Sequence, residues 1–217
     1  MSTKKLPCVI GLCGRSGAGK SFVSRIFEKQ GVPAIDTDEV YREMTGVPRG
    51  GKMSSCMTEL VSAFGEDILS PGGTLDRKAL SRIVFGKGGR EKLDMLNSIT
   101  HKYILSEAER RIERFHKNGA WAVIVDAPLL FESGFDKKCD FIVAASAPQD
   151  ILVERIISRD RLDTEAALRR LAAQLSDDDV RHRADFVIET DAPAERLYSR
   201  VANVLSEIRT RWVSLES

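Results

Sequence analysis

Residues 9–21 read VIGLCGRSGAGKS, and this short stretch predicts the centre of the fold. Its second part, GRSGAGKS from Gly14 to Ser21, has the spacing G-x-x-x-x-G-K-[ST] of a loop that binds nucleotide phosphates. The apolar run before the loop indicates a buried strand, and the segment KSFVSRIFEKQ after it has helical periodicity. A strand, this loop and a helix in that order predict a phosphate-binding site.

The residue types of the loop suit the backbone chemistry of phosphate binding. Glycines let the chain wrap closely around phosphates with its N–H groups pointing inward. Lys20 is expected to reach the β- and γ-phosphates, and the Ser21 hydroxyl is expected to hold Mg²⁺. The residues that we assign to nucleotide binding are Gly14, Arg15, Ser16, Gly17, Ala18, Gly19, Lys20, Ser21 and Phe22.

Composition and charge indicate an ordinary globular protein. Of the 217 residues, 42% are hydrophobic and 30% are charged, and the net charge of +1 gives no general attraction to nucleic acid or membranes. The apolar runs are too short to cross a bilayer, and the four cysteines have no metal-ligand spacing. We expect a cytoplasmic protein without nucleic-acid or membrane partners, and the sequence leaves its oligomeric state open.

Further short runs rich in valine and isoleucine alternate with helical segments. These runs are residues 32–36, 121–127, 141–147 and 186–190. They contain few polar residues, as expected for strands that helices cover on both faces. The alternation predicts an α/β protein with a parallel five-stranded sheet between helices.

Two segments interrupt this alternation within one expected domain, residues 1–217. Residues 40–118 contain several helical stretches and predict a helical subdomain inserted between the second and third strands. Residues 159–185, here called the arginine segment, are crowded with arginine and aspartate, with a helix predicted over about residues 164–175. This segment is typical of a mobile cover over a site.

Carboxylates are predicted at the ends of two strands, where an open parallel sheet has its ligand crevice. Asp36 and Asp38 follow the second strand. A carboxylate there could take a proton from a hydroxyl or hold a metal through water, but Asp38 could equally cap the next helix. Asp126 ends the third strand, which is the usual place of a second carboxylate associated with Mg²⁺. Such a carboxylate can contact the ion directly or through a water molecule. The residues PLLFE from Pro128 would form an apolar wall for an acceptor.

Arginines gather in and just before the arginine segment. They are Arg155, Arg159, Arg161, Arg169, Arg170, Arg181 and Arg183. Guanidinium groups stabilise the charge that develops in phosphoryl transfer, although the same side chains could form a solvated face paired with neighbouring acids. Arg155 and Arg159, four residues apart on a helix, are the stronger candidates for the first role. For Arg77 and His101 the sequence does not distinguish a structural role from a contact with a ligand.

The ordered motifs resemble the dephospho-coenzyme A kinase family over nearly the whole chain. They are GLCGRSGAGKS, IDTDEV, AFGEDIL with GTLDRKALSRIVF, LNSITHKYI, DAPLLFESG and ADFVIET. The resemblance implies a P-loop kinase fold in which residues 40–118 bind coenzyme A and residues 159–185 form a lid. It implies transfer of the ATP γ-phosphate to the ribose 3′-hydroxyl of dephospho-CoA, with Mg²⁺.

The resemblance also implies roles for single residues. Asp38 would be the catalytic aspartate, with Lys20, Arg155 and Arg159 assisting it, and Gln174 would belong to the lid. Ser21 and Asp126 would serve the metal. The residues implied in acceptor binding are Arg77, His101, Pro128, Leu129, Leu130, Phe131 and Glu132.

The chain departs from the family pattern at a few positions, and two other functions remain to be separated by experiment. Arg15 and Phe22 stand where the family has glycine and threonine, Lys102 replaces a proline, and Thr190 with Asp191 replaces an asparagine. A nucleoside or nucleoside-monophosphate kinase is the nearest alternative. An ATPase or GTPase switch is disfavoured, because a base-reading N-K-x-D motif is missing.

Overall fold

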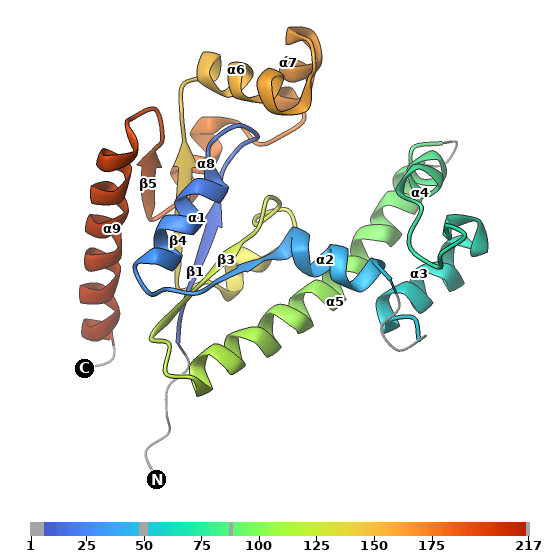
Figure 1. Ribbon diagram of the computed structural model, residues 1–217, viewed down its shortest axis with the longest axis horizontal. Helices are drawn as coiled ribbons and strands as arrows, with labels where there is room; N and C mark the ends of the chain where they lie inside the picture. Colours follow the sequence, from blue (N-terminus) through green and yellow to red (C-terminus); the bar gives the residue numbers. More distant parts are fainter. Residues whose placement is uncertain (1–6, 48–51, 87–88, 216–217) are drawn as a thin grey trace. The chain divides into compact units, whose positions relative to one another are not determined.

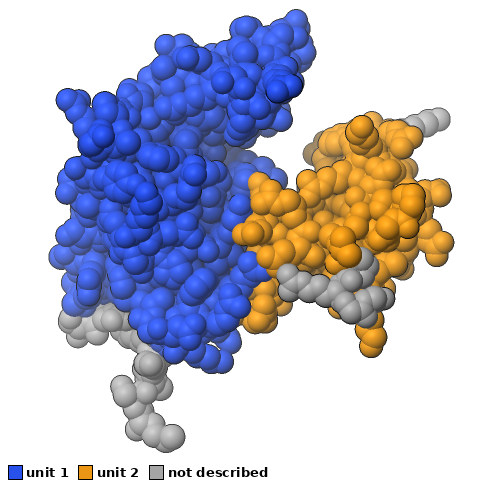
Figure 2. Space-filling model, in the orientation of Figure 1, with its two compact units in different colours: residues 1–36, 111–217 blue, residues 37–110 orange. Residues whose placement is uncertain are grey.

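The computed structural model describes residues 7–47, 52–86 and 89–215. Two compact units make up the chain, coloured separately in Figure 2. Unit 1 comprises residues 1–36 and 111–217, and unit 2 comprises residues 37–110. The role of residues 40–118 in substrate binding stays a prediction. Within the described part of the chain, no helix combines the length and apolar character that a membrane span needs.

Unit 1 is built on a parallel sheet in the strand order β2-β3-β1-β4-β5 (Figure 1). The strands are β1 (Cys8–Cys13), β2 (Ala34–Asp36), β3 (Ala122–Asp126), β4 (Phe141–Ser146) and β5 (Phe186–Glu189). The α/β class and the five-stranded parallel sheet were both predicted, and both are confirmed. Because β1 pairs with β3 on one side and β4 on the other, the loop after β1 leaves from the middle of the sheet.

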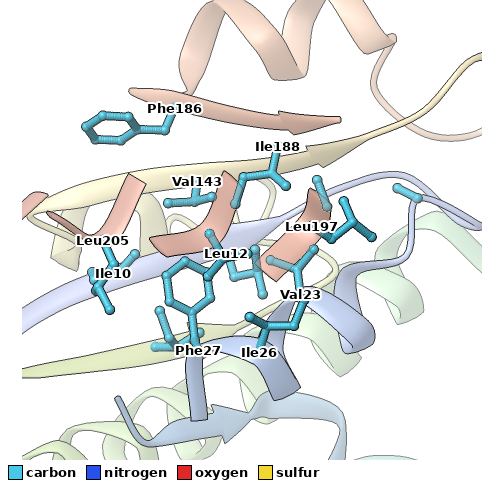
Figure 3. Packing of buried hydrophobic residues seen from close by; sticks show 14 of the residues in the cluster. Ile10, Leu12, Val23, Ile26, Phe27, Val143, Phe186, Ile188, Leu197 and Leu205 are labelled. Atoms are coloured by element: carbon cyan, nitrogen blue, oxygen red, sulfur yellow. The ribbon is translucent and has the colours of Figure 1, made fainter. Parts of the chain in front are cut away.

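The helices of unit 1 pack against this sheet or, in residues 149–172, against each other. They are α1 (Lys20–Lys29), α6 (Gln149–Asp160), α7 (Thr164–Ala172), α8 (Asp177–Arg183) and α9 (Ala194–Leu215), with a 3-10 turn at Phe135–Lys138 and the end of α5 (Gly89–Lys117). Figure 3 shows Leu12 of β1 close to Phe27 of α1 and near Leu197 of α9. Burying a side chain of this size contributes about 1.5–3 kcal/mol, so this contact anchors α1, and with it the loop before α1.

The opposite face of β1 is closed by residues from the segment after β3. A Cβ atom at Gly11 would lie 2.8 Å from Cys139 Sγ and 2.9 Å from Leu130 Cδ2. Real Cβ atoms do not approach so closely, so glycine is needed here for space rather than for an unusual backbone angle. Leu130 and Cys139 therefore pack directly on the central strand.

The arginine segment differs from its predicted form. Helix α7 ends at Ala172 instead of continuing to about residue 175, and α8 (Asp177–Arg183) follows it. The side chain of Ser176 accepts a hydrogen bond from the Asp179 amide at 3.0 Å, and the first turn of α8 is acidic while its last turn is basic. A capping serine, acidic residues in the first turn and basic residues in the last turn all stabilise a helix. The sequence therefore contains a recognisable pattern for α8.

Unit 2 is helical and has its own core. It contains α2 (Thr37–Thr45), α3 (Ser55–Phe64), the 3-10 turn Glu66–Ile68, α4 (Arg77–Val84) and the first part of α5. Leu60, Ile68 and Leu80 are buried together in this core. Helix α5 begins at Gly89 and runs to Lys117. Its early residues REKLDMLN are mostly good helix formers, which accounts for a start so soon after α4.

Candidate active site

The phosphate-type loop connects β1 to α1 through glycines that other residues cannot replace. Gly14 has φ 152° and Gly17 has φ 82°, both in the region that favours glycine. A Cβ at Gly14 would also lie 2.5 Å from the carbonyl oxygen of Ala145, and one at Gly17 would lie 2.6 Å from that of Leu152. The glycines were predicted to let the loop approach phosphates, and they also let it approach β4 and α6.

Lys20, the first residue of α1, forms an ion pair with Asp126 at the end of β3. The pair is largely enclosed, because the side chains are 15% and 6% exposed. Asp36 belongs to the same end of the sheet, since its Cα is the register partner of Asp126. Ser21 follows Lys20 and is exposed. The structure thus brings together an ammonium group, two strand-end carboxylates and a hydroxyl-bearing helix start.

Arg155 braces the loop from the side of α6. Its Nη1 donates to the Gly17 carbonyl at 3.2 Å and to Thr190 Oγ1 at 2.9 Å, and its Nη2 donates to the Thr190 carbonyl at 2.8 Å. The Thr190 hydroxyl donates in turn to the Ala18 carbonyl at 2.8 Å. Arg155 was a candidate for stabilising reacting phosphate. That role stays a prediction, and in this structure the guanidinium group holds the loop together with Thr190, which the sequence marked only as a departure from the family pattern.

Arg159 lies on the same helix one turn later and is held by its neighbour. Its Nε and Nη2 donate to the two carboxylate oxygens of Asp160, each at 2.8 Å, and Nη2 also lies 3.4 Å from Ser16 Oγ. The hydrogen bonds from Arg159, and then the contact with Arg170, lower the pKa of Asp160 to about 2. Arg159 is 60% exposed, so its charge borders the loop without being buried.

The remaining arginines of the arginine segment have separate structural partners. Arg169 pairs with Glu165 on the exposed face of α7, whereas Arg170 pairs with Asp160. Arg181 pairs with Asp177 and lies 2.7 Å from Glu189. Arg183 lies over the Phe131 ring, and Arg161 ends α6 with a positive φ of 55°. The expectation of acid-paired arginines therefore holds for several of them.

The PLLFE residues do not form one uniform surface. Pro128, Phe131 and Glu132 line a small hollow with the loop residues Gly14 and Arg15. Leu129 is 49% exposed, whereas Leu130 is completely buried beneath β1. In this conformation Leu130 supports the wall from below and is not accessible to a ligand.

Asp38 and Arg77 are exposed residues of unit 2. Helix α2 begins at Thr37, so Asp38 is its second residue, inside the first turn. Arg77 is the first residue of α4, and its guanidinium carbon lies 5.4 Å from the centre of the Tyr41 ring. Each side chain is thus presented at the start of a helix.

His101 is half-buried in the middle of α5, and burial lowers its pKa. The neighbouring Lys102 has a structural contact within unit 2. Its Nζ lies 2.6 Å from Glu59 on α3, and the Tyr103 hydroxyl donates to the same carboxylate at 2.7 Å. The residue that departs from the family pattern therefore joins α5 to α3.

A second hollow, of about 310 Å³, lies on the other side of the loop. Its lining residues are Gly19, Phe22, Arg155, Thr190, Ala192, Ala194 and Leu197. Phe22 was assigned to the nucleotide site from its place in the motif. The residues after β5 were not assigned, and the only sequence signal for them was their departure from a family pattern.

The central loop, its lysine and the strand-end carboxylates, arranged on this sheet order, define a P-loop kinase fold. A family model described as dephospho-CoA kinase matches residues 8–195. The chain belongs to the dephospho-CoA kinase family, and it is accordingly an ATP-dependent kinase.

Individual proteins agree with this assignment. The dephospho-CoA kinase of Corynebacterium efficiens is 36% identical over 204 residues, which cover 93% of this chain and 98% of that protein. Among solved structures, the protein TT1252 from Thermus thermophilus has a TM-score of 0.78 at 30% identity, covering 94% of this chain and 98% of its own. The dephospho-CoA kinase from Campylobacter jejuni has a TM-score of 0.67 at 25% identity, with coverage of 92% and 96%.

Proposed function

We propose that this protein transfers the γ-phosphate of ATP to the ribose 3′-hydroxyl of dephospho-CoA, the final step of coenzyme A synthesis. The observation that carries the proposal is the enclosed Lys20–Asp126 pair beside the P-loop, in a chain that matches the family over residues 8–195. Phosphoryl transfer depends mainly on positioning and electrostatic stabilisation. The site residues would therefore act by holding ATP, Mg²⁺ and dephospho-CoA in place. We expect the reaction to take place in the cytoplasm.

The P-loop would hold the phosphates of ATP. Its backbone amides and the positive end of α1 attract phosphate oxygens. Lys20 stands at the first position of that helix, and its ammonium group would exchange Asp126 for the β- and γ-phosphates. The ion pair therefore keeps the lysine beside the loop until a nucleotide arrives.

The hollow of about 310 Å³ beside Gly19 is where we place the adenine. Its walls are largely apolar, which suits an aromatic base, and the Arg155 guanidinium offers a planar cation to stack on it. The hydrogen bonds of Arg155 to Gly17 and Thr190 would keep that plane in place. Arg155 would then shape the loop and contact the base with the same side chain.

The residues that would serve Mg²⁺ are Ser21 and Asp126. A hydroxyl and a carboxylate are the hard oxygen ligands that this ion prefers, and it usually takes few of them from the protein. Bound Mg²⁺ neutralises charge on the β- and γ-phosphate oxygens. Asp126 is almost buried, so its carboxylate would keep a fixed orientation. It would bind the ion directly or through a water molecule.

For the acceptor, we propose that Asp38 orients the 3′-hydroxyl and takes its proton. Asp38 is exposed in the first turn of α2, which makes its carboxylate accessible. The further residues proposed to contact dephospho-CoA are Arg77, His101, Pro128, Leu129, Phe131 and Glu132. Arg159 is the arginine that we propose for stabilising the developing negative charge, because its side chain is exposed and already near Ser16.

A coupled assay of ADP release tests the function across dephospho-CoA, uridine, AMP and CMP. We expect turnover with dephospho-CoA, dependent on Mg²⁺, and little with the other acceptors. Turnover with a nucleoside or nucleoside monophosphate but not with dephospho-CoA would overturn the proposal. Steady ATP hydrolysis without any acceptor would indicate an ATPase instead.

A further inference from the structure

Two consecutive P-loop residues are hydrogen-bonded to the last turn of α7 and to the connection that follows it. The Ser16 amide donates to Oε1 of Gln174 at 3.0 Å. Nη2 of Arg15 donates to the Leu171 carbonyl oxygen at 2.8 Å. We call these two contacts the α7 latch. They join the loop that was predicted to bind phosphate to the segment that was predicted to cover it.

The acceptor in the first contact is a carboxamide oxygen, which can accept the same amide hydrogen that a phosphate oxygen could accept. A P-loop binds phosphate through inward-pointing amides, and an amide hydrogen makes one strong hydrogen bond at a time. The Ser16 amide gives that bond to a carboxamide oxygen from outside the loop. By contrast, the Ala18 amide is used inside the loop, donating to the Arg15 carbonyl at 3.0 Å. While Gln174 holds the Ser16 amide, that amide is not available to a phosphate oxygen.

The second contact holds the end of α7 near the loop. Leu171 lies in the last turn of α7, where a cation is favourable, and its carbonyl oxygen also accepts the Gln174 amide at 3.2 Å. The contact does not satisfy the whole guanidinium group, since Arg15 Nε is buried and finds no hydrogen-bond partner among the described residues. A buried donor without a hydrogen-bond partner costs free energy. A new acceptor for Arg15 could therefore displace its contact with the Leu171 carbonyl.

Gln174 is also well placed to move. It follows the end of α7 at Ala172 and precedes the start of α8 at Asp177, so it lies in a short non-helical connection. Withdrawing its side chain would break the contact with Ser16 without breaking a helical hydrogen-bond ladder. The connection can therefore change while α7 and α8 stay folded.

We propose that Gln174 competes with a phosphate group of the nucleotide for the Ser16 amide, so that ATP binding opens the α7 latch. This inference rests on the proposed function, in which the P-loop receives the phosphates of ATP. Thermodynamic linkage makes the effect reciprocal: the contact with Gln174 lowers the affinity for ATP, and ATP loosens the end of α7. Gln174 is thus a residue that sets nucleotide affinity in the kinase.

The variant Gln174→Met tests the competition, because methionine has a similar length but no oxygen to accept the amide hydrogen. Dissociation constants for ATP and for adenosine would be measured by competition with a fluorescent nucleotide. ATP should bind about two- to tenfold more tightly, which corresponds to the net value of one hydrogen bond, while adenosine binding should not change. Gln30→Met is the matched control, since Gln30 follows the far end of α1 and contacts the Tyr198 carbonyl.

Hydrogen exchange supplies a second measurement on the same proteins. In the wild type, ATP should speed exchange of the α7 amides near Leu171, and in Gln174→Met exchange should already be faster without ATP. Unchanged or weaker ATP binding by Gln174→Met would overturn the competition. If circular dichroism shows that this variant is not folded, Gln174→Ala takes its place with the same expectation.

The variant Lys20→Ala distinguishes a failure of the proposed function from a failure of the α7 latch alone. If Lys20→Ala binds ATP as well as the wild type does, the P-loop is not the nucleotide site and the proposed function fails. If Lys20→Ala loses ATP binding while Gln174→Met merely equals the wild type, only the α7 latch is refuted.

Discussion

Asp36 and Asp126 stand opposite each other at the carboxyl ends of β2 and β3, where their Cα atoms are register partners. On its other side Asp126 is the register partner of Leu12, two residues before the P-loop. The backbone ladder of the sheet thus brings both carboxylates to the level of the loop. Because a slip of one residue would turn these side chains to the other face, the register decides which carboxylate meets Lys20.

Lys20→Ala is expected to weaken both ATP binding and turnover. The change removes the ammonium group that would contact the phosphates, and it removes the ion pair between this group and the nearly buried Asp126. We expect at least about a tenfold weaker ATP affinity, the usual effect of losing a hydrogen bond to a charged group. Calorimetric titration would measure it, with Lys29→Ala as the control because Lys29 contacts Tyr198 at the other end of α1.

Asp38→Asn is expected to separate chemistry from nucleotide binding. Loss of a positioned proton acceptor should lower turnover with dephospho-CoA by about 10²- to 10⁴-fold. The dissociation constant for ATP should stay within about twofold, since the P-loop itself is unchanged. Glu39→Gln is the matched control in the same helical turn. Near-normal turnover in Asp38→Asn would remove Asp38 from the proposed mechanism.

Thr190→Val is expected to disturb the P-loop from a distance in sequence. It removes the hydroxyl that accepts from Arg155 and donates to the Ala18 carbonyl. Leaving buried groups without partners should lower the free energy of unfolding by about 1–3 kcal/mol, and ATP affinity should also fall. Urea denaturation and nucleotide titration would measure the two effects. Thr190→Ser should restore most of the loss, and the exposed Thr210→Val should have little effect on either.

The features that could be predicted from the sequence are those with local causes. The P-loop, the five strands and the strand-end position of Asp126 follow from residue spacing and from apolar runs, and the structure contains all of them. The brace on the loop could not be predicted, because Arg155 and Thr190 are 35 residues apart and no local pattern links them. The direction of Arg15 towards Leu171 is likewise decided by packing between distant segments.

Gly11→Ala is expected to destabilise unit 1 by overpacking. The new methyl group would meet Cys139 Sγ and Leu130 Cδ2 at distances under 3 Å. Forcing a methyl group into a packed core costs about 1–3 kcal/mol. The second change Cys139→Ala should recover part of this loss, because it removes one of the two clashing atoms. Chemical denaturation of both single variants and the double variant would show this coupling, whereas strictly additive effects would contradict the packing explanation.

Buried thiols should make the protein less stable in alkali. Burial raises the pKa of Cys13 and of Cys139 to about 12, and that of Cys56 to about 11, from 9.0. Above pH 9 the unfolded chain would release these protons while the folded chain keeps them, so unfolding becomes more favourable as pH rises. Each thiol adds at most about 1.4 kcal/mol per pH unit to this loss. Urea denaturation between pH 8 and about 10.5 should show a shallower decline for Cys13→Ala than for the wild type.

The bond between Thr190 and Ala18 spans 172 positions of the chain. During synthesis, the ribosome therefore delivers the P-loop well before it delivers Thr190. A nascent chain therefore has the glycines, the lysine and the serine long before it has the residue that holds the loop in shape. We expect truncated chains that end before β5 to retain nucleotide poorly, so that ATP can help to complete folding only after β5 and Thr190 have been made.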